Sequence, residues 1–466
     1  MAIRSFFTNS IGIFVSRILG FLRDVLTATT LGANVYSDIF FVAFRLPNLF
    51  RRIFAEGAFT QAFLPAFTQA TKKGVFAFGV LARFFGFLLG LTLLVMLFAP
   101  WLTKLIAFGF DQDTIALAAP LVRINFWYLP LIYLVTFAAS MLHYKGHFAT
   151  TAFSTALLNI AMIGALLLSD PSDPHQVAWN LSFGVITGGV LQALTHAYAL
   201  KKLRLLKALF GGFFHRKKSK EHQPPAFYKN FFHAVLGGST AQLSAFLDTW
   251  LASFLAFGSI SYLYYANRVF QLPLAIFAIA LSTAIFPSIT RALKNADETR
   301  ARAQLERGFW ILCYLLCLAT LGGMMLSYEI TWLLFERGAF SAQDTANTAL
   351  VLQMYLLGLL PFGLARIFSL WLYANNGQAK AAKISALSLG VNIVLSLALI
   401  SPLGAAGLAL ASSLSGFILL FYTIKAYGTT AFLAIMRPRN IALLGLVLLL
   451  GALFSWVIKE GLRGYL

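Results

Sequence analysis

Charged side chains are scarce in this chain of 466 residues. Only 11% of the residues are charged, against about 25% in soluble globular domains. Hydrophobic residues make up 59% of the chain, and the mean hydropathy is +0.78. Such a chain cannot cover itself with a hydrated surface, so the composition excludes a soluble globular protein and indicates an integral membrane protein.

Residues that serve catalysis or metal binding are also few. Cys313 and Cys317 lie four residues apart in an apolar segment, where helix packing explains them better than a disulfide or a metal site. His143 and His147 flank a short loop without a third ligand nearby. The dipeptide Gly-Lys, which a phosphate-binding loop of the G-x-x-x-x-G-K-[ST] type requires, does not occur. These absences argue against an ATPase, a metalloenzyme or another enzyme, and favour a transporter without a cofactor.

Long hydrophobic runs, in contrast, recur along the whole chain. A run of about 20 residues spans the roughly 30 Å hydrocarbon core as a helix. We therefore predict an all-α polytopic membrane protein with about thirteen spans. The expected spans are 5–31, 36–66, 76–102, 116–142, 148–169, 177–199, 228–256, 259–290, 305–327, 344–373, 381–400, 403–425 and 440–458.

The net charge of +20 is unevenly placed. With a cytoplasmic N-terminus, most Lys and Arg fall in cytoplasmic segments, as the positive-inside rule requires. The basic residues expected outside are Lys104, Arg337, Lys459 and Arg463. The largest basic block, 201–220, is then cytoplasmic, and we expect it to contact anionic phospholipids rather than nucleic acid.

A long polar connection divides the chain into two halves. We predict an N-lobe of six spans over 1–200, a basic cytoplasmic loop over 201–227, a C-lobe of six spans over 228–425, and one extra C-terminal span within 426–466. Six spans per half is an even number, so both halves enter the membrane from the same side. Such parallel repeats are related by a pseudo-two-fold axis along the membrane normal, with a cavity expected between them.

Matching motifs in the two halves support an internal repeat. They occur in the same order, and the first half carries one extra helical turn in the second span. The matches are Arg45-Leu46-Pro47 with Gln271-Leu272-Pro273, residues 62–68 with 284–290, Leu129-Pro130 with Leu360-Pro361, Gly146 with Gly377, and Asn159 with Asn392.

The second expected span carries five ionisable side chains, each of which costs about 2.5–3.5 kcal/mol near the bilayer centre. Asp38, Arg45 and Arg52 are seven residues apart and Glu56 follows four later, so they fall on one helical stripe. Arg51 is the fifth. We expect the stripe to face water or a charged substrate.

Arginine outnumbers the acids within the spans. In the first span Arg17 and Asp24 are predicted to share a face, whereas Arg23 points elsewhere. The arginines in span interiors are Arg17, Arg23, Arg45, Arg51, Arg52, Arg123, Arg268 and Arg366, and the acids are Asp24, Asp38, Glu56 and Asp248. Because four acids cannot neutralise eight arginines, we expect an anion path lined by guanidinium groups. Structural ion pairs between helices are the alternative.

Three segments carry a resemblance to a known family. SRILGFLRD (16–24), SDIFFVAFRLPNLFRRIFAEGAF (37–59) and YYANR (264–268) are similar to segments of the MurJ (MviN) family of bacterial lipid II flippases. That family belongs to the multidrug/oligosaccharidyl-lipid/polysaccharide exporter superfamily. The sequence departs from the family pattern at Asn267, where the family commonly has Asp, and in having about one span fewer.

The resemblance implies a flippase that moves lipid II from the cytoplasmic to the periplasmic leaflet of the bacterial cytoplasmic membrane. Lipid II and other cell-wall synthesis proteins are the implied partners. Another polyisoprenoid-oligosaccharide or drug exporter of the superfamily is the second interpretation. The expected substrate-binding residues are Arg17, Arg23, Arg51, Arg52 and Arg268.

The acids of the spans and Arg45 have two expected roles. Asp24, Asp38 and Glu56, together with Arg45, are expected to form gating ion pairs. Asp248 lies alone in its span, and a lone intramembrane carboxylate is a functional candidate. It could couple transport to sodium or to a proton, with a hydrogen bond to a neighbouring helix as the alternative.

Overall fold

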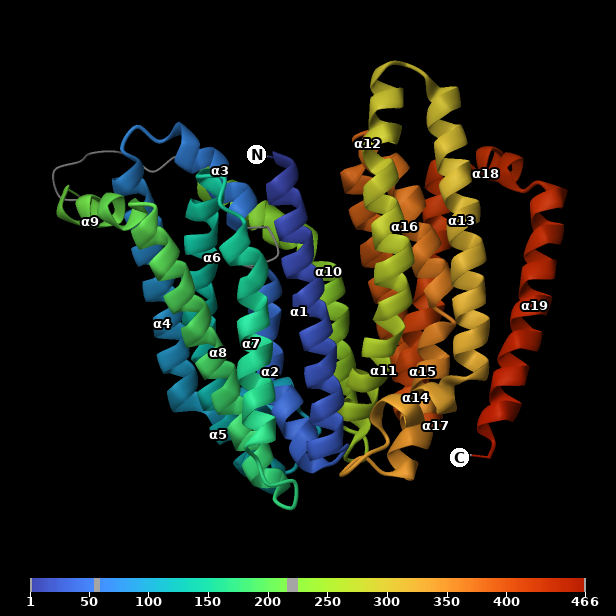
Figure 1. Ribbon diagram of the computed structural model, residues 1–466, viewed down its shortest axis with the longest axis horizontal. Helices are drawn as coiled ribbons and strands as arrows, with labels where there is room; N and C mark the ends of the chain where they lie inside the picture. Colours follow the sequence, from blue (N-terminus) through green and yellow to red (C-terminus); the bar gives the residue numbers. More distant parts are fainter. Residues whose placement is uncertain (1, 54–58, 216–224, 465–466) are drawn as a thin grey trace. The chain divides into compact units, whose positions relative to one another are not determined.

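The computed structural model describes residues 2–53, 59–215 and 225–464, and all regular elements in these ranges are helical. The all-α prediction is therefore confirmed for the described residues. The chain divides into two compact units, Met1–Phe257 and Gly258–Leu466, which are called unit 1 and unit 2 (Figure 1).

Unit 1 is built from ten helices in its described residues. They are α1 (Ala2–Leu31), α2 (Val35–Ile53), α3 (Phe59–Gln69), α4 (Lys73–Ile106), α5 (Gln112–Phe126), α6 (Tyr128–Tyr144), α7 (Ala149–Leu167), α8 (Pro174–Lys202), α9 (Leu205–His215) and α10 (Pro225–Ala252).

Unit 2 contains nine α-helices and one π-helical segment in its described residues. They are α11 (Ser259–Pro273), η3 (Leu274–Ile279), α12 (Ala280–Lys294), α13 (Glu298–Met325), α14 (Ser327–Phe335), α15 (Ala342–Leu356), α16 (Leu359–Ala374), α17 (Gln378–Tyr427), α18 (Thr429–Ile435) and α19 (Pro438–Leu462).

Nine helical segments in the described residues are long and apolar enough to cross a membrane. They cover every expected span except 5–31, 36–66 and 228–256, which coincide with α1, with α2 and α3, and with α10. In the described residues, each hydrophobic run therefore forms helix where the sequence predicted it, although several spans consist of two shorter helices.

The helix α17 contains two expected spans joined by a sharp turn. Gly404 has a positive φ of 55°, a conformation in which only glycine avoids a Cβ clash. The Ser388 hydroxyl donates to the carbonyl oxygen of Ser415 over 2.8 Å, and Asn392 Nδ2 donates to Ser412 Oγ over 3.4 Å. The two halves of α17 therefore run antiparallel as a helical hairpin.

The sequence predicted a loop over 201–227, but the structure contains helix within this segment. The helix α8 extends to Lys202, α9 occupies residues 205–215, and α10 begins at Pro225. In addition, α10 packs against α2 and α3, so it belongs to unit 1 although the sequence assigns it to the C-lobe. The lobe boundaries proposed from the sequence stay a prediction.

A buried aromatic cluster joins α3 to its neighbours within unit 1. Phe59 and Phe63 are fully buried, and their ring centroids lie 5.4 Å apart. Phe63 also meets Phe137 of α6 at 5.4 Å, and Phe59 meets Phe227 of α10 at 6.0 Å. Since such ring pairs add about 0.5–1.5 kcal/mol beyond burial, the cluster accounts for the attachment of α10 to unit 1.

The C-terminal helix α19 is fastened to α13 within unit 2. The Trp310 indole N–H donates to the carbonyl oxygen of Ile435 over 3.1 Å, just before α19 begins. At the other end of the helix, Lys459 Nζ lies 3.7 Å from the buried Glu329 carboxylate. The expected extra C-terminal span is thus part of unit 2.

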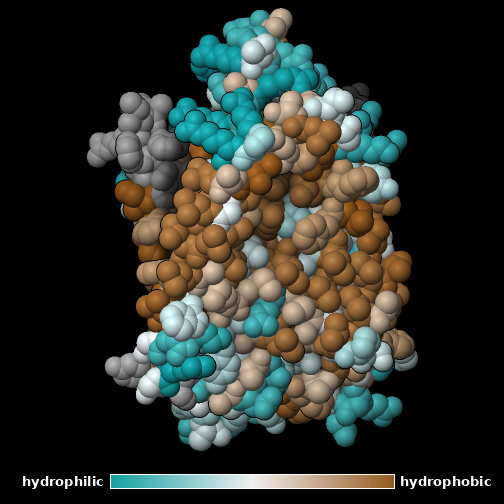
Figure 2. Space-filling view, turned by 90° about the vertical axis from the view of Figure 1, so that its right-hand side faces the viewer, coloured by the Kyte–Doolittle hydropathy of each residue, from teal (hydrophilic) through white to brown (hydrophobic). Residues whose placement is uncertain are grey.

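The outer side of α19 is apolar. Figure 2 shows a broad hydrophobic band on this side of the molecule, between hydrophilic ends. The large side chains that α19 exposes include Leu446, Leu449, Leu450, Leu453 and Phe454. Such a surface is unfavourable in water and suits contact with lipid chains.

Candidate functional site

Arg23 and Asp24 form a buried ion pair in α1. The Nη2 and Nε atoms of Arg23 lie 2.6 Å and 3.1 Å from Oδ1 of Asp24, and the two residues are only 8% and 3% exposed. Removing two charges from water is costly, and their mutual attraction repays this only when further hydrogen bonds satisfy both groups. Arg23 therefore requires additional partners.

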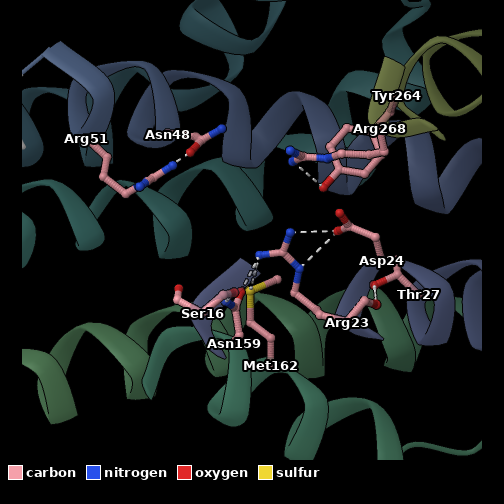
Figure 3. Close-up of polar contacts among 10 residues, drawn as sticks. All are labelled: Ser16, Arg23, Asp24, Thr27, Asn48, Arg51, Asn159, Met162, Tyr264 and Arg268. Carbon is pink, nitrogen blue, oxygen red and sulfur yellow. Dashed lines mark hydrogen bonds and ion pairs between the residues drawn. The ribbon is translucent and has the colours of Figure 1, made fainter. Parts of the chain in front are cut away.

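Asn159 of α7 supplies one of these partners. Its Oδ1 accepts a hydrogen bond from Nη1 of Arg23 over 2.9 Å, and its Nδ2 donates to the backbone carbonyl of Ser16 over 3.0 Å. The Met162 sulfur lies 3.8 Å from the same Nη1 atom. Figure 3 shows these groups around the Arg23 guanidinium. Arg23, Asp24 and Asn159 are called the Arg23 network below.

The structure places the charges of α1 in different surroundings. Arg17 is exposed while Asp24 is buried, so the two do not share an environment. Arg23, expected to point elsewhere, pairs with Asp24. Helical spacing gives the direction of each Cα–Cβ bond, but the long arginine side chain turns back to its chain neighbour.

A second polar group lies close to the Arg23 network. Tyr128 at the start of α6 is fully buried, and its hydroxyl donates to Oε1 of Gln192 over 3.2 Å. Gln192 in turn donates to the carbonyl oxygen of Ser154 over 2.9 Å. Arg51 of α2 and Arg23 of α1 both lie within electrostatic range of Tyr128.

The charged stripe of α2 is only partly described. Asp38 lies in the first turn, is 2% exposed, and is favoured there by the helix dipole. Arg51 is half-buried, and its Nε donates to Oδ1 of Asn48 over 3.0 Å (Figure 3). The side chain of Arg52 and the whole of Glu56 lie outside the described residues, so their expected roles stay predictions.

Arg45 and Asp248 lie within electrostatic range of each other in unit 1. The positive charge of half-buried Arg45 acts on the Asp248 carboxylate, and α2 contacts α10. The Oδ1 atom of Asp248 is buried and accepts no hydrogen bond within the described part of the chain. The lone acid of the seventh span thus has a cation nearby and one unsatisfied oxygen.

In unit 2, Arg268 of α11 is held by its own helix. Its Nη2 donates to the Tyr264 hydroxyl over 2.8 Å, and its Cζ lies 4.6 Å from the centre of the Tyr264 ring, as Figure 3 shows. Arg268 is half-buried. Asn267, where the family commonly has an acid, accepts a hydrogen bond from the Gln271 side chain. The tyrosine fixes the guanidinium by a hydrogen bond and a cation–π contact.

The remaining intramembrane arginines differ from these. Arg123 is half-buried and its Nε atom has no hydrogen-bond partner in the described residues, whereas Arg366 is exposed. Both cysteines are free. No group of three His, Cys, Asp or Glu in the described residues could hold a metal ion. Among the arginines of the spans, Arg51 and Arg268 thus donate hydrogen bonds to neutral side chains, whereas Arg23 pairs with an acid.

Sequence reasoning missed the partners that position these guanidiniums. In the sequence, Asn159 stands out as a repeat match with Asn392, and Tyr264 as part of a motif. A polar residue recurring at matched places inside apolar spans is a signal, because a buried amide must find hydrogen-bond partners. The spacing of Tyr264 and Arg268, one helical turn apart, is another.

Comparison with known proteins identifies the family. A family model described as "Lipid II flippase MurJ" matches residues 27–463. A "Probable lipid II flippase MurJ" of Helicobacter pylori is 52% identical over 447 residues, covering 92% of this chain and 97% of that protein. The Haemophilus influenzae protein of the same description is 33% identical over 435 residues, covering 89% of this chain and 82% of that protein.

Solved structures give the same result for the fold. A structure described as "Lipid II flippase MurJ, inward closed conformation" is similar with a TM-score of 0.78 and 26% identity, covering 97% of this chain and 98% of that one. An inward-facing multidrug resistance MATE transporter of the MOP superfamily has a TM-score of 0.67 at 11% identity, covering 93% and 99%. The similarity to the MATE transporter shows the fold alone.

Proposed function

Because the chain belongs to the MurJ family of lipid II flippases, we propose that it moves lipid II, an undecaprenyl-diphosphate-linked peptidoglycan precursor, from the cytoplasmic to the periplasmic leaflet. It is a multi-pass membrane transporter and not an enzyme. Its proposed location is the bacterial cytoplasmic membrane, with the N-terminus in the cytoplasm, and lipid II is its proposed partner.

The observation that best supports this proposal is the environment of the Arg51 side chain. Its guanidinium is half-buried, and its hydrogen bond within the described residues goes to the neutral amide of Asn48. A guanidinium held by a neutral group keeps its full charge for an incoming anion, and its planar fork matches a phosphate in bidentate fashion. We assign a diphosphate contact to Arg51. The sequence also predicts contacts from Arg17, Arg23, Arg52 and Arg268, of which Arg23 is paired with the Asp24 carboxylate in the structure.

Alternating access is the proposed transport mechanism. Pro47 interrupts α2, Pro65 interrupts α3, and in unit 2 the π-helical segment η3 follows Pro273. Such interruptions supply the bends that moving helices need. Asp38 and Glu56 would then pair with arginines when the substrate is absent.

The membrane potential is the proposed driving force. A diphosphate carries about two negative charges, and an interior-negative potential drives an anion outward with about 2.3 kcal/mol per charge per 100 mV. Coupling to sodium or a proton through Asp248 is the alternative, supported by its buried unsatisfied oxygen. An ionophore that collapses the potential at constant ATP should stop translocation. If translocation by the Asp248→Asn variant no longer depended on sodium or pH, this would instead support coupling to an ion.

The test of the function is the accessibility of lipid II in the outer leaflet of cells depleted of this protein. Expression of the unaltered chain should restore it, whereas Arg51→Ala and Arg268→Ala should fail, and Arg51→Lys should restore it only in part. Arg337→Ala is the control because Arg337 is exposed and does not belong to the arginines of the span interiors. Full restoration by both Arg51→Ala and Arg268→Ala would contradict the arginine assignment, and no effect of depletion would contradict the function.

A further inference from the structure

The short helix α9 presents an outward aromatic surface. It follows α8 after a turn at Arg204, whose φ is 59°. Phe210, Phe213 and Phe214 are 63%, 52% and 73% exposed. Their spacing places them on one side of the helix. We call these three residues the aromatic surface of α9. Large exposed apolar groups clustered in this way mark an interaction site.

The side of α9 that carries Leu205, Leu209 and Gly212 is fixed to α4, and at its border the Phe213 ring meets Phe78 of α4 at 5.2 Å. Leu205 and Leu209 are buried, and a Cβ atom added at Gly212 would overlap the carbonyl oxygen of Gly74. The reverse contact is equally close, because a Cβ at Gly74 would overlap the carbonyl oxygen of Ala208. The two backbones therefore touch, and Figure 1 shows α9 lying across the ends of α4 and α8.

This attachment sets the depth of α9 relative to the membrane. Gly74 is the second residue of α4, which is one of the membrane-spanning segments. Lys202 is the last residue of α8, another such segment. A helix held at the ends of two spans lies at the boundary between hydrocarbon and water, where an amphipathic helix inserts its apolar side.

The surroundings of the aromatic surface are basic. Neither residues 59–110 nor residues 174–220 contain an acidic residue. Four exposed cations lie at the N-terminal end of α9 and are called its flanking cations: Lys201, Lys202 and Arg204 precede the helix, and Lys207 lies in its first turn. Aromatic groups beside cations at the membrane boundary complement a leaflet that contains anionic lipid. A purely apolar partner would not require this charge.

We propose that α9 is a lipid-docking helix. Phe210 and Phe214 insert among the headgroups and upper acyl chains, and the flanking cations contact anionic phospholipid headgroups. Through the backbone contact of Gly212 with Gly74, the leaflet then holds the ends of α4 and α8. This inference does not depend on which substrate the protein transports, because the ligand is the bilayer itself.

The test is backbone hydrogen exchange of residues 205–215 in the full chain, reconstituted in nanodiscs of phosphatidylcholine alone or mixed with phosphatidylglycerol. We expect at least about tenfold slower exchange with phosphatidylglycerol, since two cations at about 1 kcal/mol each already exceed the 1.4 kcal/mol of a tenfold change. Reversal of the four flanking cations to Glu should abolish the difference. The double change Phe210→Ser with Phe214→Ser should speed exchange in both lipids.

Two adjacent glycines supply a matched control for the attachment to α4. A Cβ at Gly211 meets nothing within 4 Å, so Gly211→Ala should behave like the unaltered chain, whereas Gly212→Ala should free α9 and speed its exchange. Equal exchange of α9 in the two lipid mixtures would overturn the proposal. So would a lipid effect that survives the four charge reversals. The phenylalanine variant leaves the Gly74 contact intact, so the test does not depend on how Gly212→Ala folds.

Discussion

The two compact units use matched sequence positions for different chemistry. In unit 1, Asn159 binds the Arg23 guanidinium at 2.9 Å and the Ser16 carbonyl at 3.0 Å. Its match in unit 2, Asn392, is also buried, but its Nδ2 donates to the Ser412 hydroxyl at 3.4 Å. The same amide thus serves a buried ion pair in one unit and a neutral hairpin in the other.

Unit 2 joins its hairpin to the neighbouring helices with small residues and hydroxyls. The Ser413 hydroxyl donates to the carbonyl oxygen of Met354 over 2.5 Å, and Ser388 bonds Ser415 across the hairpin. Such neutral contacts avoid the desolvation cost of buried charge. Unit 1 therefore stabilises its packing with a buried ion pair at a place where unit 2 uses neutral hydrogen bonds.

The largest expected effect is loss of the acid in unit 1. Asp24→Asn would leave the buried Arg23 without its ion-pair partner and should destabilise the protein by about 3–5 kcal/mol. Heat unfolding in detergent measures this. The control is Glu298→Gln in unit 2, because Glu298 forms an exposed pair with Arg302, and exposed pairs contribute about 0–1 kcal/mol. Equal effects of the two changes would contradict the distinction between the units.

The matched asparagines provide the second test. Asn159→Ala removes an acceptor from a charged group and should cost about 1.5–3 kcal/mol, whereas Asn392→Ala removes a neutral bond and should cost about 0.5–1.5 kcal/mol. Shifts of the midpoint temperature of unfolding give the ranking. If Asn392→Ala were the more destabilising change, the charged network would not be what sets Asn159 apart.

The third comparison concerns matched turns, where Asn376→Gly has the smallest expected effect. Gly146 has a φ of 73°, but in unit 2 the positive φ of 57° falls on Asn376, next to Gly377. A Cβ at Gly146 meets nothing within 4 Å, so Gly146→Ala should cost only the conformational penalty of about 1–2 kcal/mol. Asn376→Gly should change stability by a few tenths of a kcal/mol, since Asn tolerates this conformation. If Gly146→Ala left the free energy of unfolding unchanged, the turn would have relaxed to a conformation that alanine tolerates.

The helices were predictable because each depends on a local property. A run of about 20 apolar residues forms a helix in lipid whatever its neighbours are, and α4, α7 and α13 coincide with expected spans. The attachment of α10 to unit 1 was not predictable. It depends on Phe227 meeting Phe59, and such a contact between distant parts of the chain leaves no periodic signal. Helix α9 was missed because its 11 residues are too few to span a membrane.

The sequence by itself determined that this is an all-helical membrane protein, placed its spans and its intramembrane arginines, and carried the motifs of its family. Only the tertiary structure decided how those arginines are held. Arg23 meets Asn159 from 136 residues further along the chain, and Arg45 acts on Asp248 of α10. Burial in a helix follows from the residue's own segment, but the partner of a buried charge is whatever group another helix brings within hydrogen-bond distance. That proximity exists only after the helices have packed.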